Sequence, residues 1–371
     1  MDNVASTSGS ELTCAWGCRY SRVYVGTTDG SISMMGAKPV HRDGSIRAVA
    51  ANGSSESDGN DRSELTVPDA RWRFRLFTHA VTSVCGYEEQ NKGALLLVGS
   101  AAGELVVLRE ELELRRYQLE SAVQHICLNQ IGEFIVGDML GNLYGVTPYE
   151  ICWKSRMPSD LLKCCSEKEY YYPSMTEPSV VAIVHAKLLD VEKTLSNYVL
   201  VAAGQKYLLV THCGKKYSVI RTSTPIATLT SFPFKEEDVV LAAGEEGVIY
   251  RLVNNMSSVS KDMIEFQFYT ERWAQVSFPI VKLVTIETHA SSLEMKPSTF
   301  AWMCLGFEGE VALFHGRECV KEWNTASFGY NRKVDSGMPV DLAVVGHTDA
   351  KSTQHSGVIV FPERMLEFSL D

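Results

Sequence analysis

The sequence lacks the segments that would direct or anchor a protein in a membrane. Its first ten residues, MDNVASTSGS, are polar and do not follow the basic and then apolar plan of a signal peptide. No apolar run approaches the ~20 residues that a membrane-spanning helix needs. Basic residues are also in deficit, with 35 Lys and Arg against 45 Asp and Glu and a formal net charge of −10. We therefore expect no membrane insertion and no general binding of nucleic acid, which requires a basic face.

Motifs for catalysis and cofactor binding are missing as well. The sequence contains no G-x-S-x-G and no glycine loop that ends in GK[ST]. A structural zinc site usually combines two Cys or Cys/His pairs. The nearest approaches to such pairs are scattered: Cys14 and Cys18, the adjacent Cys164 and Cys165, and the isolated His185, His212 and His289. We therefore predict no catalytic residue, no cofactor and no metal. Free thiols in a reducing compartment are expected, which favours a cytoplasmic, nuclear or ciliary protein.

The segment that organises the chain is 94–108, ALLLVGSAAGELVVL. Leu95 to Val98 form a continuous apolar run, as expected for a strand that is buried on both faces. Gly99 and Gly103 flank a short segment in which the chain must reverse. A return strand then runs from Leu105 to Leu108. The segment therefore predicts two buried strands joined by a tight turn.

The same pattern recurs along nearly the whole chain. Each copy has an entering strand, a strand that ends near glycine, a turn, a return strand and usually a charged fourth strand. The copies cover residues 12–77, 81–119, 123–154, 180–221, 226–269, 280–323 and 340–370, and the last has only three strands. The shortest intervals between the turn glycines, Gly99 to Gly137 and Gly204 to Gly244, are 38 and 40 residues. Such intervals are typical of a propeller blade of about 40–45 residues.

Seven units of this kind predict an all-β, seven-bladed β-propeller with four-stranded antiparallel blades and a last blade that is one strand short. The blade plan resembles the WD40-like β-propeller superfamily over nearly the whole chain. The Gly-His pair and the Trp-Asp dipeptide of that superfamily are absent, and Trp153-Lys154 and Trp323-Asn324 stand near the expected places without the Asp. A pair of β-sandwiches is the structural alternative. We expect one propeller domain over residues 11–371.

Two segments interrupt this plan. Residues 52–64 contain no hydrophobic residue, so we expect a disordered insertion at about 38–69. A connector is expected at 157–178. Residues 1–10 are predicted to be disordered or to form a weak closing strand, since Val4 is their only apolar β-former.

The short last blade leaves three possibilities for its outer strand: residues 1–10, a strand from a partner protein, or an open edge. An open edge would present six residues for strand addition. These are Met365, Leu366, Glu367, Phe368, Ser369 and Leu370.

Two groups of residues are candidates for partner binding. The first is basic and combines alternate residues of one predicted outer strand with residues of the next unit: Arg71, Arg73, Arg75, Arg109, Arg115 and Arg116. It would form a docking patch for an acidic segment, or it would be a solvated edge. The second is the triplet Tyr170, Tyr171 and Tyr172 of the connector, since exposed tyrosines are enriched at interfaces. Packing against the propeller side is the alternative for the tyrosines.

The sequence thus favours a non-catalytic scaffold subunit of a eukaryotic multiprotein complex, with other protein subunits as its partners. A ciliary or trafficking coat, a nuclear pore subcomplex and a ubiquitin-ligase receptor are the kinds of assembly considered. The alternative is a module that reads a peptide motif on one propeller face. A propeller enzyme is the third hypothesis.

Overall fold

We describe the fold from a computed structural model. The described residues are 10–18, 21–36, 47–50, 70–89, 93–157, 180–189, 194–212, 215–234, 236–254, 268–286, 300–324, 338–348, 353–362 and 364–370. In this part of the chain, no helix has the length and apolar character needed to cross a membrane.

The regular structure of the described residues consists of strands. In chain order they are β1 (Leu12–Gly17), β2 (Arg22–Thr27), β3 (Ser31–Gly36), β4 (Arg47–Ala50), β5 (Ala70–Arg75), β6 (Val81–Glu89), β7 (Gly93–Ser100), β8 (Glu104–Arg109), β9 (Leu112–Gln118), β10 (Val123–Gln130), β11 (Glu133–Asp138), β12 (Asn142–Val146), β13 (Ile151–Arg156), β14 (Ala182–Leu189), β15 (Leu195–Ala202), β16 (Tyr207–His212), β17 (Lys215–Arg221), β18 (Thr228–Phe234), β19 (Glu237–Ala243), β20 (Val248–Asn254), β21 (Phe268–Gln275), β22 (Ile280–Ile286), β23 (Ala301–Gly306), β24 (Val311–His315), β25 (Glu318–Trp323), β26 (Asp341–Thr348), β27 (Thr353–Val360) and β28 (Arg364–Ser369).

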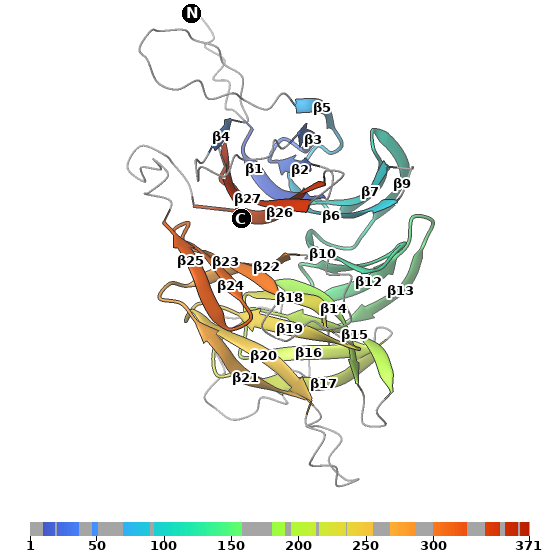
Figure 1. Ribbon diagram of the computed structural model, residues 1–371. Helices are drawn as coiled ribbons and strands as arrows, with labels where there is room; N and C mark the ends of the chain where they lie inside the picture. Colours follow the sequence, from blue (N-terminus) through green and yellow to red (C-terminus); the bar gives the residue numbers. More distant parts are fainter. Residues whose placement is uncertain are drawn as a thin grey trace, which may run out of the picture.

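These strands form seven antiparallel sheets, which are the blades of a propeller (Figure 1). Blade 1 is β1-β2-β3-β5, blades 2 to 6 are β6–β9, β10–β13, β14–β17, β18–β21 and β22–β25, and blade 7 is β26-β27-β28-β4. The innermost strands contact one another in a closed circle, in the order β1, β6, β10, β14, β18, β22, β26 and back to β1. The predicted all-β, seven-bladed propeller is therefore confirmed.

The two glycines of the organising segment have different tasks. Gly103 has a φ of +80° and lies in the turn between β7 and β8, where a residue with a side chain would be strained. Gly99 lies in β7, and a Cβ there would overlap the side chain of Val123 in the next blade. Gly26 and Gly137 meet the first valine of the following blade in the same way. In these three pairs the first glycine therefore permits close packing of neighbouring blades, and the second serves the turn.

The seventh blade differs from the expectation in the origin of its fourth strand. The C-terminal segment supplies three strands, as predicted, and the outer position is taken by β4, which pairs with β28 at Met365↔Val49, Leu366↔Ala48 and Glu367↔Arg47. Figure 1 shows β4, in blue, beside the red strands of the C-terminal segment. The predicted open edge is thus covered by the chain itself along Arg364–Glu367.

The closing strand comes from the insertion at about 38–69, for which no structure was expected. That expectation is wrong at Arg47–Ala50, because a short strand can borrow its stability from an existing sheet edge. Residues 1–9 and the remainder of the insertion lie outside the described residues. After β4 the chain returns to blade 1, where β5 completes the first sheet.

Hydrophobic clusters lie between neighbouring blades and fix their spacing. Between blades 5 and 6, Trp302 stacks on Phe314 with ring centroids 4.1 Å apart, and the Nε1 groups of Trp273 and Trp302 both donate to the Gly316 carbonyl. A further cluster joins blades 1 and 7 and includes residues of β1, β2, β26 and β27. Trp273 and Trp302 belong to the cluster between blades 5 and 6, and Trp16 packs against the cluster between blades 1 and 2.

Candidate functional site

Four of the innermost strands break register at the same place, one residue after they begin. The breaks lie between Leu12 and Cys14, Val81 and Ser83, Val123 and His125, and Ile280 and Lys282. Such bulges leave a residue unpaired and change where neighbouring side chains point. The residues after the breaks therefore occupy equivalent positions around the centre of the propeller: Cys14, Ser83, His125 and Lys282.

Side chains at this level join each blade to the next. The amide of Ile126 donates to Ser83 Oγ at 3.1 Å, and the amide of Leu283 donates to Thr228 Oγ1 at 3.0 Å. Both bonds run from the innermost strand of one blade to that of the preceding blade. The polar groups are thus used to satisfy amides that the register breaks release from the sheets.

The strongest contact of this kind closes the ring. Asp341, at the start of β26, accepts the amide of Ala15 through Oδ2 at 2.9 Å and the amide of Leu342 through Oδ1 at 2.9 Å. Its Oδ1 also pairs with Lys282 Nζ at 2.9 Å. One carboxylate, 7% exposed, therefore connects blades 6, 7 and 1. The Lys282 side chain keeps 34% of its surface accessible because it faces the central channel.

Three other ionisable side chains of the innermost strands are held in their neutral forms. Burial raises the pKa of the Cys14 thiol to about 12 and that of Cys85 to about 11. Burial lowers the pKa of His125 to about 3, and its Nδ1 has no hydrogen-bond partner within the described structure. A nucleophilic thiol needs a lowered pKa, and a general base needs one near neutrality. These three side chains are therefore poorly suited to nucleophilic or acid–base catalysis at neutral pH.

For Lys282, burial opposes the charged form, but the ion pair and hydrogen bond with Asp341 outweigh it and raise the pKa. The ammonium group is therefore charged at neutral pH and is not an amine nucleophile. Within the described ranges, no group of three or more His, Cys, Asp and Glu side chains is placed to hold a metal ion.

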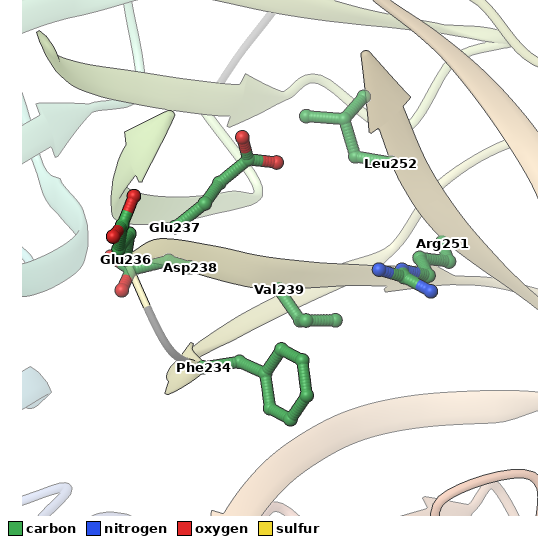
Figure 2. A pocket seen from close by; sticks show the side chains of 7 residues that line it. All are labelled: Phe234, Glu236, Glu237, Asp238, Val239, Arg251 and Leu252. Carbon is green, nitrogen blue, oxygen red and sulfur yellow. The ribbon is translucent and has the colours of Figure 1, made fainter. Parts of the chain in front are cut away.

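A cavity of about 280 Å³ lies on blade 5, at the turn between β18 and β19 and against β20 (Figure 2). Its walls combine apolar and charged groups: Phe234, Val239, Leu252, Glu236, Glu237, Asp238 and Arg251. Figure 2 shows the carboxylates of Glu236 and Asp238 on one side and Arg251 on the other. Asp238 accepts the amide of Lys187 at 2.7 Å, so this carboxylate also fastens blade 4 to blade 5. Arg251 lies over the Trp273 ring at 4.9 Å, and its buried Nε has no hydrogen-bond partner among the described atoms.

The predicted basic candidates do lie on neighbouring blades, but much of their charge is matched by acidic neighbours. Arg73 pairs with Asp29 at 2.7 Å and Arg109 with Glu89 at 3.4 Å. Arg116 is the most engaged, since it pairs with Glu113 and Glu104 at 2.8 and 2.9 Å. It also donates to the Leu76 carbonyl and lies over the Phe77 ring, which ties blade 2 to the end of β5.

Two other candidates have local partners. Arg75 donates to the Phe77 carbonyl at 3.1 Å, and Arg115 lies over the Tyr117 ring at 5.9 Å. These contacts favour the solvated-edge interpretation of the basic group over a docking patch. The side chain of Arg71, together with Tyr170, Tyr171 and Tyr172, lies outside what the structure describes.

Several side chains singled out in the sequence have local roles. Cys14 and Cys18 are buried free thiols in the core between blades 1 and 2. His185 contacts the side-chain oxygen of Asn197, and His212 contacts the backbone carbonyl of the same residue. His289, Cys164 and Cys165 lie outside the described residues.

Large apolar side chains protrude from the loops at both ends of the blades. Tyr149 and Ile131 are each 80% exposed, and Leu112 is 64% exposed, all at turns on one face of blades 2 and 3. On the other face, Met139 is 57% and Phe307 45% exposed. The sequence reasoning missed these residues, although a hydrophobic residue at a hairpin turn, as in Gln130-Ile131-Gly132, is a usable signal.

Comparison with known proteins establishes the fold. The sequence matches no protein-family model and no curated protein. Among solved structures, BBS1N in complex with ARL6DN has a TM-score of 0.59 and 13% identity, over 100% of this chain and 95% of that one. The β-propeller domain of Myceliophteria thermophila Cps50 (Swd1) has a TM-score of 0.60 and 10% identity, over 98% of this chain and 99% of that one. At these identities the likeness concerns the fold alone, which is that of a β-propeller.

Proposed function

We propose that the protein is a non-catalytic scaffold that binds other protein subunits through the loops of its propeller faces. The observation that carries this proposal is the exposure of large apolar side chains at the loop tips, where they contribute nothing to the core. Exposed aromatic and aliphatic anchors on a rigid support are typical of protein–protein interfaces. Among the similar structures, BBS1N is recorded with a protein, ARL6, bound to it.

The state of the channel supports a role without catalysis. Its polar side chains hold neighbouring blades together, and the thiols of Cys14 and Cys85 are kept protonated. In propellers that bind proteins, the ring acts as a stiff frame, and the loops carry recognition. A subunit of a eukaryotic complex in the cytoplasm, nucleus or cilium remains the proposed setting.

The proposal is tested by isolating the tagged full-length chain from its source cells at physiological salt, followed by mass spectrometry. We expect a small set of proteins in stoichiometric amounts. Recovery of the chain as a free monomer that carries a bound small molecule would contradict the scaffold role.

A second candidate function is the reading of a peptide motif at the cavity on blade 5. Its mixed wall of carboxylates, Arg251 and Phe234 would suit a peptide with charged side chains next to an apolar one. Replacement of Glu236, which is exposed at the rim, by Lys tests this function without touching the carboxylate that holds Lys187. If the cavity reads peptides, E236K should abolish recovery of the partner, whereas a pure scaffold that uses other loops should retain it.

A further inference from the structure

Three exposed apolar side chains gather over the junction of blades 2 and 3. Ile131 comes from the β10–β11 turn, Tyr149 from the β12–β13 turn and Leu112 from the β8–β9 turn. All three turns lie at the same end of the blades, because strands alternate in direction. Figure 1 labels the outer strands β9 and β13 of these two blades. We call the surface around these three residues the blade 2–3 face.

Contacts between the blades hold these turns side by side. Tyr117 of β9 donates its hydroxyl to the Thr147 carbonyl of the β12–β13 turn at 3.4 Å. Tyr87 of β6 lies close to the β10–β11 turn, since a Cβ at Gly132 would come within 3.9 Å of its hydroxyl. The pKa of Tyr87 is raised by burial and then by Glu89, and Tyr149 contributes to the same shift. The blade 2–3 face is therefore one continuous surface that spans two sheets.

The turn that carries Tyr149 is rigid. Thr147 Oγ1 accepts the amides of Tyr149 and Glu150 at 3.3 and 3.1 Å, and the Thr147 amide donates to the Glu150 carbonyl at 2.9 Å. The backbone is thus fixed while the ring projects into solvent. A pre-ordered aromatic anchor loses little conformational entropy when a partner covers it.

Ile131 has no evident use within the fold. It occupies a two-residue turn before Gly132, which has a φ of +88°. Ile131 itself does not have a positive φ, so the turn geometry accepts most residues at this position, polar ones included. The turn therefore does not require an apolar side chain, and that of Ile131 is 80% exposed. Its presence points to a contact outside this chain.

Acidic residues are in excess around this surface. In the four turns and their flanks, 87–93, 109–113, 130–133 and 147–151, the sequence has seven glutamates and two basic residues. They are Glu88, Glu89, Glu110, Glu111, Glu113, Glu133 and Glu150 against Lys92 and Arg109. Glu89, Glu110 and Glu113 pair with Arg109, Arg22 and Arg116, and with these arginines counted the glutamates are still in excess. An apolar centre with an acidic rim is complementary to a partner that carries lysine or arginine around apolar side chains.

We infer that the blade 2–3 face binds a basic amphipathic segment of a partner protein, with Ile131 and Tyr149 as its anchors. This inference rests on the proposed scaffold function and names the surface and the partner class. The glutamates steer the basic segment and align it, while the two apolar anchors supply most of the affinity.

The test uses the full chain and three short synthetic peptides that share their apolar positions and carry lysine, glutamine or glutamate at all others. Binding is followed by fluorescence anisotropy at low and at physiological salt. The lysine peptide should bind at least about tenfold more tightly than the glutamate peptide, and salt should weaken it. Equal binding of the three peptides, or binding of none, would overturn the inference.

The anchors are tested with the double variant I131N/Y149S, in which both replaced side chains are 80% exposed, so folding should be retained. The control is Met139→Ser, an exposed apolar residue at the opposite end of the same blade. The double variant should lose at least about tenfold in affinity for the lysine peptide, and the control should not. Unchanged binding by the double variant would overturn the inference. So would a dimer of the wild-type chain that this variant dissociates, since a second copy would then occupy the surface.

Isolation from source cells separates this inference from the proposed function. If the wild-type chain and the double variant recover the same proteins equally, the scaffold role stands and the blade 2–3 face is refuted. If the wild-type chain recovers no protein, the scaffold role itself fails.

Discussion

Replacement of Asp341 tests whether one carboxylate holds the last blade to the first. In Asp341→Ala, the amide of Ala15 loses its acceptor in a buried position, at a cost of about 1–3 kcal/mol. Lys282 loses its partner as well. Breaking a fully buried pair costs about 3–5 kcal/mol, but Lys282 reaches water in the channel, so its share is smaller. We expect the free energy of unfolding to fall by about 3–5 kcal/mol in total.

The assay is equilibrium urea unfolding, followed by tryptophan fluorescence and circular dichroism. Asp341→Asn is the matched variant: its amide oxygen still accepts the Ala15 amide, so we expect a loss of about 1–2 kcal/mol from the ion pair alone. Combining it with Lys282→Met completes a double-mutant cycle, in which the coupling should be about 1–2 kcal/mol. A loss below about 0.5 kcal/mol for Asp341→Ala, the range of an ordinary surface change, would refute the reasoning.

Three further predictions concern the closing strand, the channel and the basic edge. Successive amides of a strand point to opposite sides, so only one of Ala48→Pro and Val49→Pro removes a hydrogen bond to β28. That variant alone should lose about 1–3 kcal/mol of the free energy of unfolding, measured by thermal unfolding. Equal losses in the two variants would argue against the pairing. Because burial lowers the pKa of His125 from 6.5 to about 3, the unfolded chain binds a proton that the folded chain does not as the pH falls below 6.5. Between pH 7 and 5, the free energy of unfolding of the wild type should therefore fall by at most about 2 kcal/mol more than that of His125→Gln, which lacks this group. Parallel pH profiles of the two proteins would contradict the prediction. Arg116→Ala should lower the free energy of unfolding in urea by about 1 kcal/mol, because two carboxylates and a carbonyl lose a partner. Arg115→Ala should change it by less than about 0.5 kcal/mol. The reverse order would contradict the role of Arg116 in tying blade 2 to the end of β5.

The blade pattern was predictable because it is local in sequence. In β7 and β8, the apolar runs and the glycine turn lie within a few residues of one another, and the structure pairs Leu97 with Val107 as the turn requires. The positions of the turn glycines then defined the other blades. The alternate arginines of the predicted outer strand were also visible in the sequence, and in β5 Arg73 and Arg75 are exposed.

The closing strand and the channel contacts were not predictable, for different physical reasons. The four residues of β4 have little strand signal of their own and depend on the edge of β28. The link from Asp341 to Ala15 joins residues 326 positions apart, and no local pattern reports such a contact. The exposed anchors Ile131 and Tyr149 leave a trace in the sequence only as apolar residues at turns, which the search for a core passes over.

The route of the chain through β4 has a consequence for synthesis. Val49 pairs with Met365, which is 316 residues later in the chain. At about 5–20 residues per second, a ribosome takes roughly 16–60 s to make that interval. Throughout this time, Arg47–Ala50 has no edge to join, although β1, β2, β3 and β5 are already available to form the first sheet. The ring can therefore be completed only after nearly the whole described chain has emerged, and for that interval the nascent chain carries an unused strand that chaperones or other strand edges can bind.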